Sequence, residues 1–268
     1  MASHPLFRAF KANKASFGAW LTLPGTFPAR TLAQASPHLD WVVVDCEHGL
    51  IPLVPGVAES VSAIQGARPG GGPSAIVRIP ATGVTASSSW QIKHALDAGA
   101  RGVLVPMVST AEKASEVVAD SLFPPGGRRG FGSPFTHGIW GVTVPEYLEA
   151  ANKHILIMVQ IETKEAVENV RAIAAVEGID AVFIGPYDLS ISLGYPPPSP
   201  DPHPEVEKVI QKIREEAHAV GTKCAIFCTS GAQGAIRAKQ GFDMINVTSD
   251  TGSMTEGIAK HLADASGQ

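Results

Sequence analysis

Eight short apolar runs, rich in β-branched residues, recur along the chain and alternate with segments of helical spacing. We expect strands at residues 17–23, 41–45, 75–79, 102–107, 155–162, 181–186, 223–228 and 244–249. Nearly continuous apolarity is typical of parallel strands that are buried on both faces. The pattern predicts a closed (β/α)8 TIM barrel. An open doubly wound sheet is the alternative fold, but it would not need eight evenly spaced units.

The segments between these runs predict helices. We expect them at residues 54–65, 89–98, 110–119, 164–176, 204–220 and 232–240. Several of these segments open with Ser, Thr or Pro and stop at glycines such as Gly99 and Gly178, which are ordinary helix boundaries. A chain of 268 residues without a domain boundary fits one barrel, so we expect a single domain over residues 1–268.

Two connections are longer than the others. Residues 123–142 mix glycine with aromatic and basic side chains, and a short helix is expected at 145–151. Long loops in compact domains are usually functional, so we expect a lid or a subunit contact. The proline-rich stretch 194–204 predicts a stiff surface loop.

Composition excludes several classes of protein. The net charge of -4 argues against a nucleic-acid binder, and no apolar run reaches the roughly 18 residues that cross a bilayer. The three cysteines, Cys46, Cys224 and Cys228, form neither a disulfide framework nor a CxxC zinc pattern. With no apolar signal core at the start, we expect a cytoplasmic protein, although the first 14 residues are basic and lack acids, as in a mitochondrial address.

The carboxyl ends of barrel strands carry active sites, and polar residues gather at four of them here. Glu162 and Asp188 follow neighbouring strands and are candidate ligands for a hard divalent cation, which needs only one or two carboxylates. Such an ion could act as a Lewis acid on a chelated 2-oxo acid and stabilise its enolate. An ion pair or a helix cap is the alternative role for these acids.

The second and third strands supply further candidates. His48 is a candidate general base, with Asp45 holding its ring in one tautomer. Alternatively, Asp45 and Glu47 satisfy backbone groups in the turn and His48 is exposed. Arg78 could hold a substrate carboxylate bidentately, or form a standing salt bridge to Asp45 or Glu47.

The remaining polar candidates flank the two acids. Gln160 lies two residues before Glu162 and so on the same face. It could donate to a substrate keto oxygen or satisfy a polar network in the core. Gly185 and Pro186 form a turn whose free backbone N–H groups could bind a carboxylate.

A lysine Schiff base is the competing mechanism. Lys164 is expected to begin a helix that faces solvent, and Lys223 stands at the wrong end of its strand. The metal route is therefore favoured. The glycine-rich GGRRGFG is not followed by GK[ST], so no nucleotide is inferred from it.

Several motifs in order resemble the HpcH/HpaI aldolase family: DCEHG, VRIP, QIKHALDAGARGVLVPMV, FPPGGRRGFGS, VQIET and GIDAVFIGPYDLSISLGYP. The resemblance runs from about residue 17 to 248. It implies a barrel of the phosphoenolpyruvate/pyruvate-binding type and a class II aldolase. Such an enzyme cleaves a 4-hydroxy-2-oxo acid to pyruvate and an aldehyde through a metal-bound enolate, with Mg²⁺, Mn²⁺ or Co²⁺.

The resemblance also implies roles. Glu162 and Asp188 would be the metal ligands, His48 the base with Asp45 behind it, and Arg78 the group that holds the pyruvate carboxylate. Gln160 matches an active-site glutamine. Asp97 matches an acid that reaches a neighbouring subunit's site, because related proteins form hexamers, often as dimers of trimers with exchanged C-terminal helices.

Residues 134–142 and 227–231 depart from the bacterial aldolases, and both regions would shape the aldehyde pocket. The related fungal enzyme macrophomate synthase decarboxylates oxaloacetate to the same enolate. Three functions therefore stay open: an aldolase, a decarboxylase of oxaloacetate or a similar acid, and a non-catalytic relative that binds a 2-oxo acid.

Overall fold

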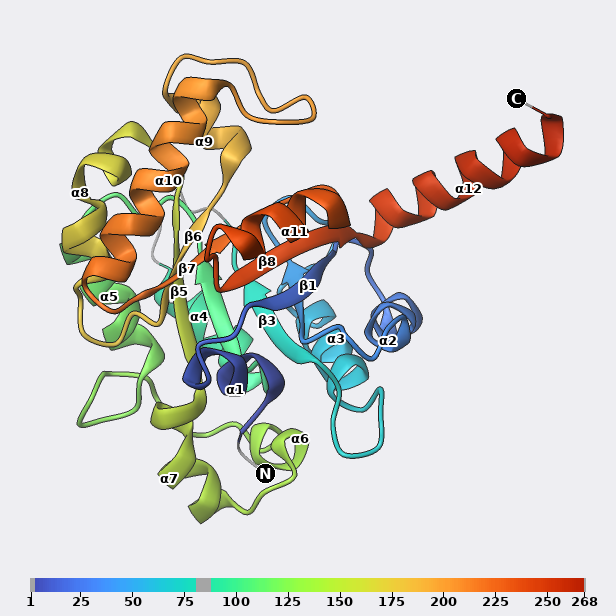
Figure 1. Ribbon diagram of the computed structural model, residues 1–268. Helices are drawn as coiled ribbons and strands as arrows, with labels where there is room; N and C mark the ends of the chain where they lie inside the picture. Colours follow the sequence, from blue (N-terminus) through green and yellow to red (C-terminus); the bar gives the residue numbers. More distant parts are fainter. Residues whose placement is uncertain (1–2, 81–87, 268) are drawn as a thin grey trace.

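The computed structural model describes residues 3–80 and 88–267, and its parallel strands close into a barrel in chain order with helices around it (Figure 1). The strands are β1 (Ser16–Leu21), β2 (Trp41–Asp45), β3 (Ser74–Arg78), β4 (Gly102–Val105), β5 (Leu156–Ile161), β6 (Ala181–Ile184), β7 (Lys223–Ile226) and β8 (Met244–Ser249). The predicted barrel is confirmed. Several strands end one or two residues earlier than expected, so Glu162, Gly185 and Pro186 lie just beyond the last paired residues.

The helices of the described chain occupy the outer layer or the barrel ends. They are α1 (Pro5–Lys11), α2 (Thr26–Gln34), α3 (Gly56–Gln65), α4 (Ser89–Asp97), α5 (Ala111–Ser121), α6 (Thr136–Trp140), α7 (Val144–His154), α8 (Lys164–Ala174), α9 (Pro186–Ser192), α10 (Pro204–Ala219), α11 (Gly231–Lys239) and α12 (Asp250–Ser266). Thr110, Thr163 and Ser230 cap α5, α8 and α11 by accepting a backbone hydrogen bond; of these, Thr110 opens a predicted helix. The prediction missed α1, α2, α6, α9 and α12.

The barrel interior is a closely packed apolar core. Val43, Ile76, Leu104 and Met158 point inward from four strands and are fully buried. At Gly18 the indole of Trp41 covers the backbone so closely that an added Cβ would come within 2.0 Å of it. A side chain at position 18 would therefore displace the tryptophan from the core.

Helix α1 closes the N-terminal end of the barrel. Its Leu6 and Phe10 are buried in the same apolar cluster as the inward-facing strand residues. His4, just before the helix, makes hydrogen bonds to the Ser74 hydroxyl at 2.7 Å and the His154 carbonyl at 2.9 Å. These contacts join the start of the chain to β3 and to the end of α7.

The long connection at 123–142 does not form a lid. It joins α5 to β5, where the Trp140 indole donates to the Gly99 carbonyl at 3.0 Å and the Arg101 guanidinium lies 4.0 Å from the same indole ring. Gly99 and Arg101 precede β4, so this contact lies at the N-terminal end of the barrel, near α1. The lid expectation was wrong because the connection follows a helix rather than a strand. The subunit contact stays a prediction.

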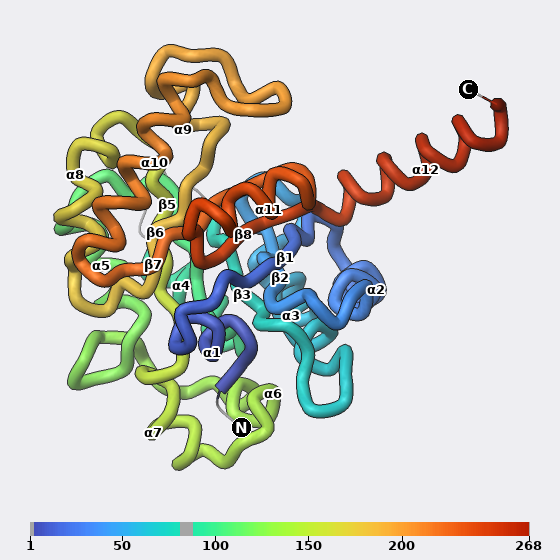
Figure 2. Tube along the Cα trace, viewed as in Figure 1, coloured from blue at the N-terminus to red at the C-terminus, as the bar shows by residue number. Residues whose placement is uncertain are grey.

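Two segments project from the surface. The proline-rich loop between α9 and α10 is mostly exposed, as predicted. Helix α12 extends away from the barrel, and none of its residues is buried (Figures 1 and 2). No helix in the described part of the chain is long and apolar enough to span a membrane. Cys46, Cys224 and Cys228 are all free thiols, as expected.

Candidate active site

A cavity of about 520 Å³ opens where the barrel strands end at their carboxyl side. Most of the site residues expected from the sequence line it. The lining residues are Trp20, Thr22, Asp45, His48, Arg78, Gln160, Phe183, Gly185, Pro186, Tyr187, Asp188, Phe227, Thr229 and Ser249. The topology of the barrel thus brings together side chains that are far apart in the sequence.

Arg78 is fixed in place by two acids from the neighbouring strand end. It donates to both carboxylate oxygens of Asp45, at 2.9 Å from Nε and 2.8 Å from Nη2. Its Nη1 lies 3.0 Å from Glu47 Oε2 and 3.4 Å from Gln160 Oε1. Burial favours the neutral form of Asp45, but the hydrogen bond and charge of Arg78 outweigh it and lower the pKa of that carboxyl. The salt bridges left open from the sequence are therefore present.

The expected contact between Asp45 and the His48 ring is absent. Asp45 Oδ1 instead accepts the backbone N–H groups of Glu47 and His48, at 3.0 and 3.3 Å. The His48 side chain is 66% exposed, and its Nε2 lies 3.9 Å from Glu47 Oε2. The prediction was wrong because the turn after β2 satisfies its own backbone with Asp45 and leaves the ring free at the cavity.

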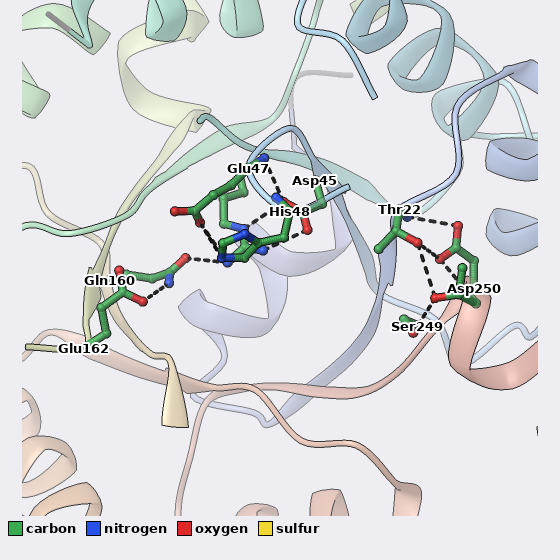
Figure 3. A network of polar contacts seen from close by, with 10 residues as sticks. Thr22, Asp45, Glu47, His48, Gln160, Glu162, Ser249 and Asp250 are labelled. Atoms are coloured by element: carbon green, nitrogen blue, oxygen red, sulfur yellow. Dashed lines mark hydrogen bonds and ion pairs between the residues drawn. The ribbon is translucent and has the colours of Figure 1, made fainter. Parts of the chain in front are cut away.

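Glu162 lies behind Gln160 at the end of β5. Its Oε1 accepts the Met107 backbone N–H at 2.7 Å, and its Oε2 accepts a hydrogen bond from Gln160 Nε2 (Figure 3). Gly185 covers the other side, where an added Cβ would come within 2.7 Å of Glu162 Oε2. Glycine at this position therefore leaves space beside the carboxylate.

Acidic groups crowd this side of the site. Burial, with the nearby charges of Glu47 and Asp188, raises the pKa of Glu162 to about 7. Burial also raises the pKa of Glu47 to about 7, against the lowering effect of Arg78. Glu47 Oε2 is buried and has no hydrogen-bond donor among the described residues, so its contact with Arg78 is an ion pair only.

These acids fit a hard divalent cation. Glu162 and Asp188 carry carboxylate oxygens of the kind that such an ion prefers, and positive charge beside them would offset the repulsion that burial strengthens. Within the described chain no group of three or more His, Cys, Asp or Glu side chains forms a metal cage. Two carboxylates suit Mg²⁺ or Mn²⁺, which keep water or substrate oxygens as their other ligands.

The two lysines considered for a Schiff base do not line the cavity. Lys164 is exposed and begins α8. Lys223 starts β7, and its Nζ is hydrogen-bonded to Asn13 at 2.7 Å and Asp243 at 2.9 Å. Among the described lining residues there is no lysine.

Asp97 also lies outside this cavity. It ends α4 and pairs with Lys93 and with Arg129, whose Nη2 lies 2.8 Å from Asp97 Oδ1. It lines a separate hollow beside residues 132–135. Its expected role in a neighbouring subunit's site stays a prediction.

Sequence reasoning missed the aromatic part of the site. Trp20, Phe183, Tyr187 and Phe227 all line the cavity. Trp20 and Phe183 sit in continuous apolar strands, where inward and outward positions look alike in the sequence. Tyr187 lies between Pro186 and Asp188, which were both candidate site residues, so its place in this motif could have identified it.

Comparison with known proteins gives the family. A model described as HpcH/HpaI aldolase/citrate lyase matches residues 19–256. The chain belongs to this family. It is 39% identical over 220 residues to a 4-hydroxy-2-oxo-heptane-1,7-dioate aldolase of Escherichia coli, covering 80% of this chain and 78% of that relative. It is 35% identical over 263 residues to a 5-keto-4-deoxy-D-glucarate aldolase of Citrobacter koseri, covering 96% and 94%.

The fold comparison agrees. The crystal structure of macrophomate synthase superimposes with a TM-score of 0.84 at 29% identity, covering 100% of this chain and 91% of that one. The resemblance deduced from the sequence motifs is confirmed. The aldolase relatives support a carbon–carbon lyase activity for this chain.

Proposed function

We propose that this chain is a metal-dependent class II pyruvate aldolase, which cleaves a 4-hydroxy-2-oxo acid into pyruvate and an aldehyde. One arrangement carries the proposal: Arg78 and Asp188 line one cavity, and Gln160, which also lines it, hydrogen-bonds to Arg78 and to Glu162 behind it. Arg78 offers a positive charge to the carboxylate of a 2-oxo acid. The two acids offer oxygen ligands to a metal ion that can bind the other end of the oxo acid.

Arg78, Gln160 and His48 each have a separate role in the proposed reaction. Arg78, held by Asp45 and Glu47, binds the substrate carboxylate and is prevented from turning away. Gln160 can donate to the keto oxygen once it releases Glu162. His48 reaches the cavity with an exposed ring and takes the proton from the 4-hydroxyl group as the C3–C4 bond breaks.

Glu162 and Asp188 would hold Mg²⁺, Mn²⁺ or Co²⁺, which when bound supplies Lewis-acid stabilisation of the negative charge that develops on the oxo acid. Gly185 and Pro186 form the turn that places Asp188 in the first turn of α9. The close approach of Gly185, where a Cβ would come within 2.7 Å of Glu162 Oε2, keeps that carboxylate free of a covering side chain and supports this assignment.

Decarboxylation of oxaloacetate is the second candidate function. It is supported by the fold shared with macrophomate synthase, and it needs the same cavity groups up to the pyruvate enolate. Both reactions break the C3–C4 bond of the oxo acid. The leaving group is an aldehyde in one and CO₂ in the other, and only the aldol cleavage needs a base for the 4-hydroxyl proton.

We also propose a homo-oligomer, either a trimer or a hexamer. The apolar side chains Met254, Ile258 and Leu262 recur every fourth residue on α12 and are 55%, 55% and 65% exposed. This stripe supports packing of α12 against another copy. The single domain over residues 1–268 and the cytoplasmic location stay predictions.

A screen of oxo acids with added Mg²⁺ or Mn²⁺, read out as pyruvate release, tests the function. Pyruvate with an aldehyde from a 4-hydroxy-2-oxo acid supports the aldolase, and pyruvate from oxaloacetate alone supports the decarboxylase. We expect Glu162→Ala to lose nearly all turnover, at least about a thousandfold, because metal stabilisation of the developing charge is lost.

Glu165→Ala is the matched control, since Glu165 is exposed on α8 close to the site strand. It should keep wild-type rates, and both variants should show a folded circular dichroism spectrum. Wild-type turnover by Glu162→Ala would remove Glu162 from the metal site. No pyruvate from any oxo acid would instead favour a non-catalytic relative.

A further inference from the structure

The active-site cavity has an aromatic side that adjoins its charged side, where the Arg78 guanidinium lies 5.2 Å from the Trp20 ring. Trp20, Phe183, Tyr187 and Phe227, here called the aromatic wall, all line it. The Trp20 ring lies 5.3 Å from both Phe183 and Phe227, and Phe227 lies 6.3 Å from Tyr187. The four rings are thus in continuous contact from the barrel interior to the rim, where Tyr187 is 40% exposed.

The aromatic wall carries no charged side chain for a second anionic group, and its one hydroxyl is that of Tyr187. Arg78 is the only Lys or Arg among the described lining residues, and the proposed function assigns it to the carboxylate of the oxo acid. The other acid exposed to the cavity, Asp188, would repel an anion further. His48 is the remaining ionisable group, and it sits beside Glu47 rather than on the aromatic wall.

The hydroxyl groups at the rim are also committed. Thr22 donates to Asp250 at 2.6 Å, and Thr229 donates to Gln233 at 3.0 Å. Ser249 caps α12 by accepting from Gly252 at 3.0 Å. The hydroxyl donors of Thr22 and Thr229 are thus engaged elsewhere in the protein, and the Ser249 hydroxyl is held in the cap of α12.

We infer that the acceptor aldehyde of this enzyme carries an uncharged, apolar tail, preferably an aromatic one, which packs on the aromatic wall. This inference rests on the proposed aldolase function and names its substrate class. It differs from what the name of the Escherichia coli relative describes, a heptane-1,7-dioate with a carboxylate at each end. Buried aromatic surface favours an apolar group, whereas burying an unpaired carboxylate there is costly.

The reverse of the proposed cleavage, in which pyruvate adds to an aldehyde, measures this preference directly. A methyl proton of pyruvate leaves to the base, C3 forms a bond to the aldehyde carbon, and the aldehyde oxygen takes a proton. The product, a 4-hydroxy-2-oxo acid, contains all the atoms of pyruvate and the aldehyde, so no further reactant is needed.

The experiment compares three aldehydes with the intact enzyme, pyruvate and Mn²⁺: phenylacetaldehyde, butanal, and 4-oxobutanoate, which has the carbon chain of butanal with a terminal carboxylate. We expect kcat/KM to be at least about tenfold higher for butanal than for 4-oxobutanoate, and higher again for phenylacetaldehyde. Exchange of the pyruvate methyl protons in D₂O, followed by NMR without any aldehyde, measures enolate formation separately.

Phe227→Lys sharpens the test by placing a cation on the aromatic wall. Each rate of addition is divided by the same protein's rate of methyl exchange. The ratio of the rate with 4-oxobutanoate to the rate with butanal should then be at least about tenfold higher in the variant than in the wild type. Ile236→Lys is the matched control: Ile236 is 55% exposed on α11 and does not line the cavity, so the wild-type preference should persist.

The outcomes separate the two proposals. Methyl exchange with a preference for 4-oxobutanoate, or an unchanged preference in Phe227→Lys, would overturn the inference and leave the enolate chemistry standing. Absence of both exchange and addition would overturn the proposed function and the inference with it.

Discussion

The two ends of the barrel are formed by the same strands but treat buried charge in opposite ways. At the N-terminal end, α1 fills the opening with Leu6 and Phe10, and burial lowers the pKa of His4 to about 3, so that it is neutral. At the C-terminal end a cavity of about 520 Å³ remains, and the Arg78 guanidinium outweighs burial and lowers the pKa of Asp45, so that this buried pair stays charged. The N-terminal end is tightly packed and its buried histidine is neutral, whereas the C-terminal end keeps buried charges and is less tightly packed. This is expected because one face of such a barrel serves stability and the other serves function.

Leu6→Ala tests the packed end and has the largest expected effect. Leu6 is fully buried, so the cavity left behind should lower the free energy of unfolding by about 2–5 kcal/mol. Urea unfolding measures this loss. Lys11→Ala, an exposed change on the same helix, should have little effect. Because Leu6 is remote from the chemistry, pyruvate turnover well below the melting temperature should stay within about twofold; a large loss of kcat would show that the two ends are not separate.

Arg78→Lys tests the charged end. Lysine keeps the charge but cannot reproduce the paired hydrogen bonds to Asp45, so the substrate carboxylate should be bound less well. We expect kcat/KM to fall about a hundredfold, about 2.7 kcal/mol, mainly through KM. Arg171→Lys, at an exposed pair on α8, serves as control. An unchanged KM for the oxo acid would contradict the carboxylate role of Arg78.

The pH dependence of stability gives the smallest effect. His4 has a folded pKa of about 3, owing to burial and then to the charges of Arg101 and Arg8, against the hydrogen bond to the His154 carbonyl, which raises the pKa. The unfolded chain, with a pKa near 6.5, therefore binds the proton first, and the free energy of unfolding falls as pH drops from about 6.5 toward 3.

Between pH 6.5 and 5.5 the wild type should lose about 1 kcal/mol more than His4→Gln, which cannot titrate. The buried acids act in the opposite direction, because the raised pKa of Asp180, about 6, favours the folded state at lower pH. Comparing the two proteins cancels that contribution. Parallel pH profiles for wild type and variant would show that His4 is not held neutral.

The sequence predicted the barrel because its strand and helix periods are distinct, and it predicted most of the groups in the cavity because strand ends converge. It did not predict which groups pair. Asp45 could contact either His48 or Arg78, and the geometry of the turn decides in favour of Arg78. Helix α1 was missed because seven residues give too short a periodic signal, and its role depends on contacts with distant strands.

Helix α12 has a consequence for how the enzyme responds to dilution. It is 17 residues long, is attached through Ser249 and Asp250, and buries none of its side chains within one chain. A helix of this length that stands alone in water is only marginally stable, so its persistence depends on the local concentration of surfaces that can cover Met254, Ile258 and Leu262. In the proposed oligomer, dilution should therefore loosen the last turns of the chain, whereas the start of the helix stays attached through Asp250, which holds Thr22 at the cavity rim.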